Sequence, residues 1–317
     1  MSAAVEGTAG WPPPVLDPAG PFAGPVNIVS WVLFGMGAVV LVIVLITLGV
    51  ALFGPRRWRT RLGGAKLIWI GGLAFPVVVL SALLIYGLGL TSHLSDEGAP
   101  GEMRVRVTGE MWWWRVAYLD DQGREAFKDA NEIHIPTGRP VVFELESADV
   151  IHSFWVPRLG GKRDMIPGRR TFLRLQADEP GAYGGQCAEY CGGPHALMGL
   201  VVVAHAPAEF EAWRQRQAAP SPAAAIPARG AEVFRTAGCG ACHSVNGTGF
   251  NGVAGPDLSH VGSRRTLGAG ILPNNQGTLG GWISDSQSLK PGNRMPAYPV
   301  LSGQDLRAVS AWLDSLE

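Results

Sequence analysis

Two long stretches without charge set the strongest limit on the fold. No charged residue or histidine occurs from Pro18 to Pro55, and the part from Asn27 to Phe53 is almost entirely apolar. A second uncharged run extends from Leu67 to Ser92. Because a helix of about 20 apolar residues is long enough to cross a bilayer, we predict two membrane-spanning helices. A cleaved signal peptide fits the first run poorly, since no basic residue precedes it and its apolar core is too long.

The segment between the two runs predicts their orientation. Residues 54–66 carry five cationic side chains and no acidic one. The positive-inside rule keeps such a short loop in the cytoplasm, so both ends of the chain are expected on the outer side. For a bacterium this predicts a multi-pass protein of the plasma membrane with periplasmic domains. Thiols in that compartment need protection by a metal or a disulfide.

Changes in composition divide the chain into five parts. A lead-in rich in Pro, Gly and Ala precedes the apolar runs, and a region of short β-prone runs follows them. A linker of Ala, Pro and Ser, too low in complexity to pack, leads to a last part with helical patterns at both ends. The predicted parts are an extended N-terminal segment (1–26), a transmembrane helix hairpin (27–92), an all-β domain (93–217), a linker (218–228) and a small all-α domain (229–317).

Four β-prone runs with turn residues between them indicate an all-β sandwich. The runs are Arg104–Thr108, Val141–Glu146, Arg170–Leu175 and Gly199–Ala204, and residues 206–217 are expected to form a short amphipathic helix that closes the domain. The fold class is therefore a multidomain membrane protein. Only 16% of the residues are charged and the formal net charge is zero, so no basic face is available for nucleic acid.

Two of the four cysteines lie in a loop with other soft ligands, which suit copper. The loop, Gly-Gln-Cys-Ala-Glu-Tyr-Cys-Gly-Gly-Pro-His-Ala-Leu-Met, contains Cys187, Cys191, His195 and Met198. A mononuclear blue-copper site needs one cysteine, whereas two thiolates can bridge two copper ions that share one electron. His152, just past the run 141–146, is the expected second imidazole. The backbone carbonyl of Glu189 can complete the shell of the second copper.

Other roles for these residues stay open at this point. Cys187 and Cys191 could form a disulfide, or a structural zinc site could use two cysteines and two histidines, although Met198 would have no place in it. The remaining histidines before the linker are expected to be ordinary surface or strand residues rather than ligands; they are His93, His134 and His205.

The other two cysteines, Cys239 and Cys242, form C-x-x-C-H with His243, which is the attachment signature of a c-type haem. The cysteines would form thioethers to the haem vinyl groups, and His243 would be the proximal iron ligand. The carbonyl of Pro256, in Gly-Pro-Asp-Leu, is expected to orient the imidazole through its other nitrogen. A thioredoxin-like redox pair is the alternative, but no βαβ pattern surrounds it.

Met295 is the candidate distal iron ligand. It is the only methionine after Met198, and a Met ligand raises the haem potential, as a donor to copper requires. The surrounding segment, Lys290-Pro-Gly-Asn-Arg-Met-Pro, resembles the distal-ligand loop of class I cytochromes c. His260 as the second ligand of a bis-His haem is the alternative.

Residues 28–215 resemble subunit II of haem-copper cytochrome c oxidase, as found fused to cytochrome c in caa-type oxidases. The family motif C-x-E-x-C-x-x-x-H-x-x-M is present without substitution. Also similar are His152-Ser-Phe-Trp-Val-Pro, Asp164-Met-Ile-Pro-Gly-Arg and the run Trp112-Trp113-Trp114. The resemblance implies a cupredoxin-like domain with a dinuclear copper A centre whose ligands are His152, Cys187, Glu189 (backbone), Cys191, His195 and Met198.

The same resemblance implies further roles. The Glu189 side chain would help to bind magnesium at the contact with subunit I, and Trp112 would be the port through which electrons reach copper. One position departs from the family, which usually has a glutamate three residues before a Trp at the start of the second helix. Here that spacing from Trp69 falls on Lys66, so the proton-channel entrance lies at another residue or in subunit I. The aromatic run also begins Gly109-Glu-Met-Trp rather than the commoner Gly-His-Gln-Trp.

The resemblances together imply an electron-transfer subunit of a proton-pumping respiratory cytochrome c oxidase. Electrons would come from a cytochrome c or the quinol-cytochrome c reductase complex, pass through haem c and copper A, and reach subunit I, where oxygen is reduced to water. Subunits I and III and membrane lipid are the expected partners. A quinol oxidase subunit II would lack the copper ligands, a nitrous-oxide reductase would lack the helix hairpin, and a copper-delivery protein would not need haem. The linker predicts a tethered haem domain whose transfer to copper is nearly independent of ionic strength.

Overall fold

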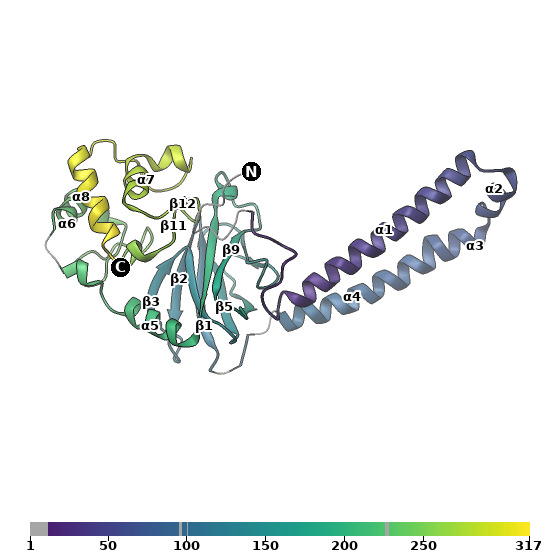
Figure 1. Cartoon of the computed structure of the whole chain (residues 1–317), viewed down its shortest axis with the longest axis horizontal. Helices are drawn as coiled ribbons and strands as arrows, with labels where there is room; N and C mark the ends of the chain where they lie inside the picture. Colours follow the sequence, from purple (N-terminus) through teal and green to yellow (C-terminus); the bar gives the residue numbers. More distant parts are fainter. Residues whose placement is uncertain (1–11, 95–96, 100, 226–227) are drawn as a thin grey trace. The chain divides into compact units, whose positions relative to one another are not determined.

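The computed structural model describes residues 12–94, 97–99, 101–225 and 228–317. The chain divides into two compact units. Gly24–Asp96 is one, and Met1–Ala23 together with Glu97–Glu317 is the other (Figure 1).

The smaller unit is a hairpin of two apolar helices. Its elements are α1 (Gly24–Phe53), α2 (Arg56–Leu62), α3 (Ala65–Leu67), a π-helical stretch η1 (Ile68–Ala74) and α4 (Phe75–Leu94). The chain runs out along α1 and returns along α4 (Figure 1). The spans Gly24–Phe53 and Ala65–Ser92 have mean hydropathies of 2.9 and 2.4, and none of their most apolar stretches is buried in protein. Both are thus long and apolar enough to cross a membrane, and they contain the two predicted runs.

Ten strands of the larger unit form two five-stranded sheets. Their orders are β3-β2-β1-β5-β8 and β4-β10-β9-β6-β7. All four predicted runs are strands, and six strands were not predicted. The bounds are β1 (Met103–Glu110), β2 (Trp113–Leu119), β3 (Glu125–Ala130), β4 (Glu132–Pro136), β5 (Val141–Ser147), β6 (His152–Trp155), β7 (Arg163–Met165), β8 (Thr171–Leu175), β9 (Gly181–Cys187) and β10 (Gly199–His205).

Aromatic side chains join the two sheets. Phe143 of β5 and Trp114 of β2 both contact Phe154 of β6, with ring centroids 5.3 and 5.7 Å apart. All three are fully buried. The predicted closing helix is α5 (Pro207–Ala218), which buries Phe210 and Trp213. This confirms the all-β sandwich and fixes its core beside the copper loop.

The N-terminal segment packs on the sandwich over the part that the structure describes. The Ala19 N–H donates to the Arg158 carbonyl (2.7 Å), and the Asp178 N–H donates to the Ala19 carbonyl (3.0 Å). Phe22 is buried. Residues 1–11 of the predicted extended segment lie outside the described residues, and α1 begins at residue 24 rather than 27.

The C-terminal part is mainly helical, with one addition to the predicted all-α fold. Gly230 of α6 allows the crossing with α8, because a Cβ there would lie 2.2 Å from the Ala308 carbonyl oxygen. A two-residue β11–β12 pair was not predicted. The elements are α6 (Arg229–Thr236), η4 (Cys239–Ala241), η5 (Val261–Ser263), β11 (Thr266–Leu267), β12 (Leu272–Pro273), α7 (Gln276–Leu289) and α8 (Gly303–Asp314).

Part of the predicted linker packs, contrary to expectation. Pro222–Ala225 forms a short 3-10 helix, η3, and Ser221 is buried. The Ala219 carbonyl lies 2.9 Å from His260 Nε2. Small side chains fit closely against the helical domain, so low sequence complexity did not prevent packing here.

The sandwich and the helical domain also share a buried contact. Arg264 Nε and Asp129 Oδ1 are 2.8 Å apart, and the two side chains are only 7% and 6% exposed. The Gly199 N–H, at the start of β10, donates to the Ala269 carbonyl (2.9 Å). The helical domain is therefore held by more than its linker.

Candidate metal and haem sites

Strand ends position the predicted copper ligands. β9 ends at Cys187 and β10 begins directly after Met198, so the loop between two adjacent strands carries the motif. The Cys187 N–H donates to the Met198 carbonyl (2.9 Å) and closes the base of this loop. His152 begins the neighbouring strand β6. The sheet thus brings together residues 35 positions apart.

The sulfur atoms of Cys187 and Cys191 are 3.7 Å apart, and the other four predicted copper ligands lie around them. Each sulfur is flanked by one imidazole nitrogen and one weaker donor. The distances are 3.9 Å from Cys187 Sγ to His152 Nδ1, 3.2 Å from Cys187 Sγ to the Glu189 carbonyl oxygen, 3.5 Å from Cys191 Sγ to His195 Nδ1 and 3.8 Å from Cys191 Sγ to Met198 Sδ.

The two thiols cannot both ionise easily without a cation. Cys191 and His152 stabilise the Cys187 thiolate and lower the pKa of Cys187 to about 3. The bond to Cys187, with burial, raises the pKa of Cys191 well above its ordinary value. Both cysteines are buried. The protein alone therefore favours one negative charge, and bound metal ions would stabilise the second.

Asp149 holds His152 in place, a role that the sequence reasoning missed. Its Oδ1 lies 2.9 Å from His152 Nε2, which leaves Nδ1 directed at Cys187. Burial opposes protonation of His152, but the bonds to Cys187 and Asp149 outweigh it and raise the pKa of His152. Gly109 leaves room for the ring, because a Cβ there would lie 2.8 Å from His152 Cδ2. Asp149 stands three residues before His152 in the motif, a spacing that could have indicated it.

Replacing Asp149 with alanine is expected to lower copper affinity by about 10- to 100-fold, the usual cost of losing a carboxylate that orients a ligating imidazole. Competition with a copper chelator measures this effect. Asp121→Ala, at an exposed turn residue, is the matched control and should bind as the wild type does. If the copper affinity of Asp149→Ala stays within about twofold of the control, Asp149 does not orient His152 for copper binding.

Trp112 packs on the copper loop. Its indole N–H donates to the Cys191 carbonyl (2.8 Å). Gly192, at φ 110°, lies under the indole, since a Cβ there would be 3.0 Å from Trp112 Cζ2. Glycine is needed at this position both for its backbone angle and for this close approach.

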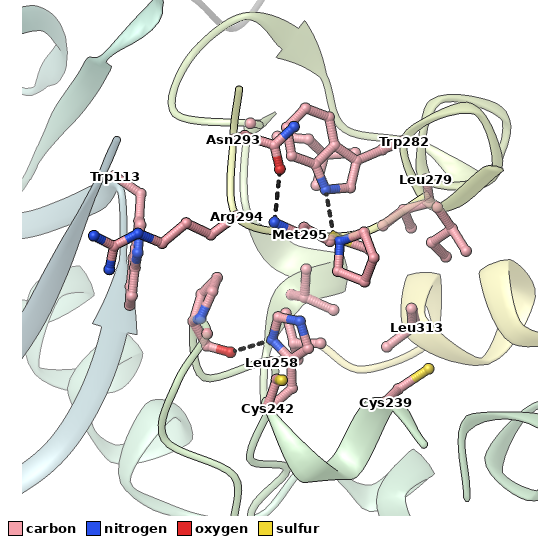
Figure 2. A pocket seen from close by; sticks show the side chains of 18 of the residues that line it. Trp113, Cys239, Cys242, Leu258, Leu279, Trp282, Asn293, Arg294, Met295 and Leu313 are labelled. Carbon is pink, nitrogen blue, oxygen red and sulfur yellow. Dashed lines mark hydrogen bonds between the residues drawn. The ribbon is translucent and has the colours of Figure 1, made fainter. Parts of the chain in front are cut away.

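A mostly apolar cavity of about 320 Å³ occupies the helical domain and reaches Trp112 and Trp113 of the sandwich. This volume falls within the range of roughly 300–1,000 Å³ typical of ligand sites. Cys239 and Cys242 lie at one side of the cavity and Met295 at the other (Figure 2). The four residues predicted to hold a haem, namely Cys239, Cys242, His243 and Met295, all line it.

Hydrogen bonds orient both predicted iron ligands. His243 Nδ1 lies 2.7 Å from the Pro256 carbonyl, as expected, so Nε2 is the nitrogen left for iron. Burial lowers the pKa of His243 and favours the neutral imidazole that a metal requires. The Trp282 indole N–H donates to Met295 Sδ (3.1 Å; Figure 2). His260, the alternative ligand, is not among the residues that line the cavity.

Lys290 is a second residue that the sequence reasoning left without a role. It is only 2% exposed, and its Nζ donates to the carbonyls of Trp112 (2.6 Å) and Gly268 (2.9 Å). Burial lowers the pKa of Lys290 to about 7. A Lys before Pro-Gly looks like a solvated loop residue, so no local signal reveals this burial.

The remaining predicted residues lie apart from the two sites. The Glu189 carboxylate is 45% exposed and lies 3.6 Å from Lys162 Nζ. His134 and His205, expected to be ordinary, form a hydrogen-bonded pair (2.7 Å), and His134 stacks on Trp213. His93 lies within the bounds of α4.

Comparisons with known proteins agree with this division of the chain. The family model for cytochrome c oxidase subunit II, periplasmic domain, matches residues 121–205, and the model for cytochrome c matches residues 227–317. Cytochrome c oxidase subunit 2 of Alkalihalophilus pseudofirmus is 36% identical, covering 95% of this chain and 90% of the relative. The Bacillus subtilis protein is 31% identical, with 83% and 78% covered. The solved periplasmic domain of subunit II (CoxB) of Bradyrhizobium japonicum is 28% identical over 38% of this chain and 96% of its own, with a TM-score of 0.35.

Proposed function

Because the chain belongs to the cytochrome c oxidase subunit 2 family, we propose that it accepts electrons at a covalent haem c and passes them to a dinuclear copper A centre. Its general role is electron transfer within a haem-copper oxidase, in association with subunit I. We further propose that electrons pass from an upstream donor through the helical domain and the β9–β10 loop to subunit I. There they would reduce oxygen in a reaction coupled to proton pumping.

The proposed electron route rests on the position of Trp112. Trp112 donates a hydrogen bond to the Cys191 carbonyl in the copper loop and also lines the cavity that holds His243 and Met295. A single residue therefore adjoins both sites, and we propose Trp112 as the electron port.

The donor sets fit the two groups. The thiols lie between two half-sites, each with one imidazole and one weaker donor, and this suits two bridged ions better than one zinc ion. A Sγ–Sγ separation of 3.7 Å also exceeds the bond of about 2.05 Å in a disulfide. In the helical domain, Cys239, Cys242, His243 and Met295 would hold the haem. When bound, both groups supply reversible one-electron chemistry.

The chain contributes rigidity and exclusion of water. Cys187 is 5% exposed and Met198 is fully buried, while Asp149 and Pro256 fix the imidazoles of the two sites. Ligands that cannot move keep the geometry similar in both redox states, and this lowers the barrier to electron transfer.

Metal and pigment analysis of the purified protein tests the cofactor part of the proposal. We expect two copper ions and one covalently attached haem per chain. One copper ion, or zinc in its place, would contradict the dinuclear assignment. Magnesium on the exposed Glu189 carboxylate and contacts with subunit III are further parts of the proposal, and both require the assembled oxidase.

We also propose a multi-pass topology with the segment between α1 and α4 in the cytoplasm, because five cations lie in residues 54–66. An Arg59→Cys variant in sealed cells should resist an impermeant thiol reagent and react only after permeabilisation. A cysteine introduced by Gln122→Cys, in an exposed turn of the sandwich, is the matched control and should react from outside. Labelling of Arg59→Cys in sealed cells would reverse the topology.

A further inference from the structure

Lys290 directly follows α7 as its C-cap residue and begins the loop that carries Met295. The Lys290 carbonyl accepts hydrogen bonds from the Asn293 N–H (3.1 Å) and from Asn293 Nδ2 (2.8 Å). Asn293 Oδ1 then accepts from the Met295 N–H (2.8 Å; Figure 2). The main chain of Lys290 is thus linked to the proposed iron ligand through a single side chain.

The side chain of Lys290 points away from this loop to the sandwich. Its Nζ lies 2.6 Å from the Trp112 carbonyl, and the same Trp112 donates its indole N–H to the Cys191 carbonyl. Hydrogen bonds, together with the covalent bonds inside each residue, therefore form a continuous path from the Met295 N–H through Asn293, Lys290 and Trp112 to the Cys191 carbonyl.

A neighbouring turn strengthens the same contact. Lys290 Nζ also donates to the Gly268 carbonyl in the β11–β12 turn. The next residue, Ala269, accepts a hydrogen bond from the Gly199 N–H, directly after Met198. The buried Lys290 amino group thus connects the Met295 loop with the β11–β12 turn and with the main chain of Trp112.

We propose that Lys290 is a positioning residue for electron transfer, whose amino group fixes the Met295 loop against the main chain of Trp112. This inference rests on the proposed function, since it concerns the separation of the two cofactor sites. Electron transfer slows steeply as two cofactors move apart, so a residue that fixes their separation and orientation helps to set the rate. A buried amino group bonded to two carbonyls holds such a separation better than a flexible linker does.

Lys290→Met tests the proposal in the full-length protein loaded with both cofactors. The substitution keeps an unbranched apolar stem and removes the donor. We expect unchanged copper and haem spectra, including the Met–iron band, but a haem-to-copper rate that falls at least about tenfold after flash reduction. Lys128→Met, at a surface residue whose Nζ lies 3.4 Å from Glu125, is the matched control and should transfer at the wild-type rate.

A second readout does not depend on turnover. The Gly199 N–H crosses from the sandwich to Ala269, so its hydrogen exchange reports on the contact itself. We expect its exchange in Lys290→Met to accelerate by about tenfold or more, because two buried carbonyls lose their donor. Lys290→Gln, which retains a shorter donor, should show a smaller acceleration than Lys290→Met.

The outcomes separate the two proposals. If the wild type shows no transfer from haem to copper, the proposed function fails. If the wild type transfers electrons but Lys290→Met matches Lys128→Met in both rate and exchange, the positioning role is overturned and the function stands. Loss of either cofactor spectrum in both Lys290 variants would show a role in folding the loop, which also overturns positioning.

Discussion

Cys191→Ser is expected to abolish the dinuclear copper spectrum and to reduce oxidase turnover to background. Cys191 Sγ lies 3.7 Å from Cys187 Sγ and also faces His195 and Met198, so a whole half-site depends on it. A serine hydroxyl stays protonated and is a hard ligand, whereas copper in this setting requires soft thiolates. The near-infrared absorption and the copper content of the purified variant measure the loss.

The haem domain provides the internal control for Cys191→Ser. Its cysteines and its proposed iron ligands lie in another part of the chain, so the haem content and the haem reduction by added reductant should remain at wild-type values. A variant that keeps the full dinuclear copper spectrum would falsify the ligand assignment. A variant that loses the haem as well would show general misfolding instead of a local defect.

Arg264→Met is expected to weaken the contact between the helical domain and the sandwich by about 3–5 kcal/mol, the usual cost of leaving one charge of a buried pair without its partner. Arg264 Nε lies 2.8 Å from Asp129 Oδ1, and its Nη2 also donates to the Asp257 carbonyl (2.6 Å). Hydrogen exchange of the Arg265 N–H, which donates to Glu132 Oε2 across the contact (2.9 Å), measures the change.

The same variant should make the contact depend more strongly on pH than it does in the wild type. Burial raises the pKa of Asp129, while Arg264 opposes this rise. His134 and Glu132 are the other titratable side chains that act on the pKa of Asp129. Without Arg264 the pKa of Asp129 rises further. A group whose pKa is raised in the folded state stabilises that state below its unfolded pKa, and the contribution is lost as the pH rises through the folded pKa. The Arg264→Met contact should therefore weaken as the pH increases.

Asp129→Asn combined with Arg264→Met separates charge from packing. The double variant removes both charges of the pair, so its contact should be stronger than that of Arg264→Met and should lose the added dependence on pH. If Arg264→Met exchanges the Arg265 N–H at the wild-type rate, the pair does not hold the domains together.

The sequence predicted most of the residues that the structure brings together at the two candidate sites, because those residues follow local spacings. The copper loop places four donors within twelve residues between two adjacent strands, and the C-x-x-C-H motif places three residues of the haem site within five. The two helices of the hairpin were equally predictable, since the thickness of a bilayer sets how many consecutive apolar residues a spanning helix needs.

The contact between the domains was not predictable, because it joins residues that are far apart along the chain. Lys290 and Trp112 are 178 positions apart, and Arg264 and Asp129 are 135 apart. Nothing near Lys290 in the sequence distinguishes a buried lysine from a solvated one. The prediction that the linker does not pack was wrong for a related reason, since Ala223 and Ala224 pack against a core that forms only in the folded helical domain.

We propose above all that electrons pass from the helical domain to the copper loop within one molecule. Stopped-flow reduction of the full-length protein, followed in the haem and near-infrared copper bands, tests it most directly. Since the domains are joined by buried contacts that salt screens little, the rate of copper reduction by the haem should be the same at two protein concentrations and at low and high ionic strength. A rate that rises in proportion to protein concentration, or that falls steeply with salt, would contradict the account.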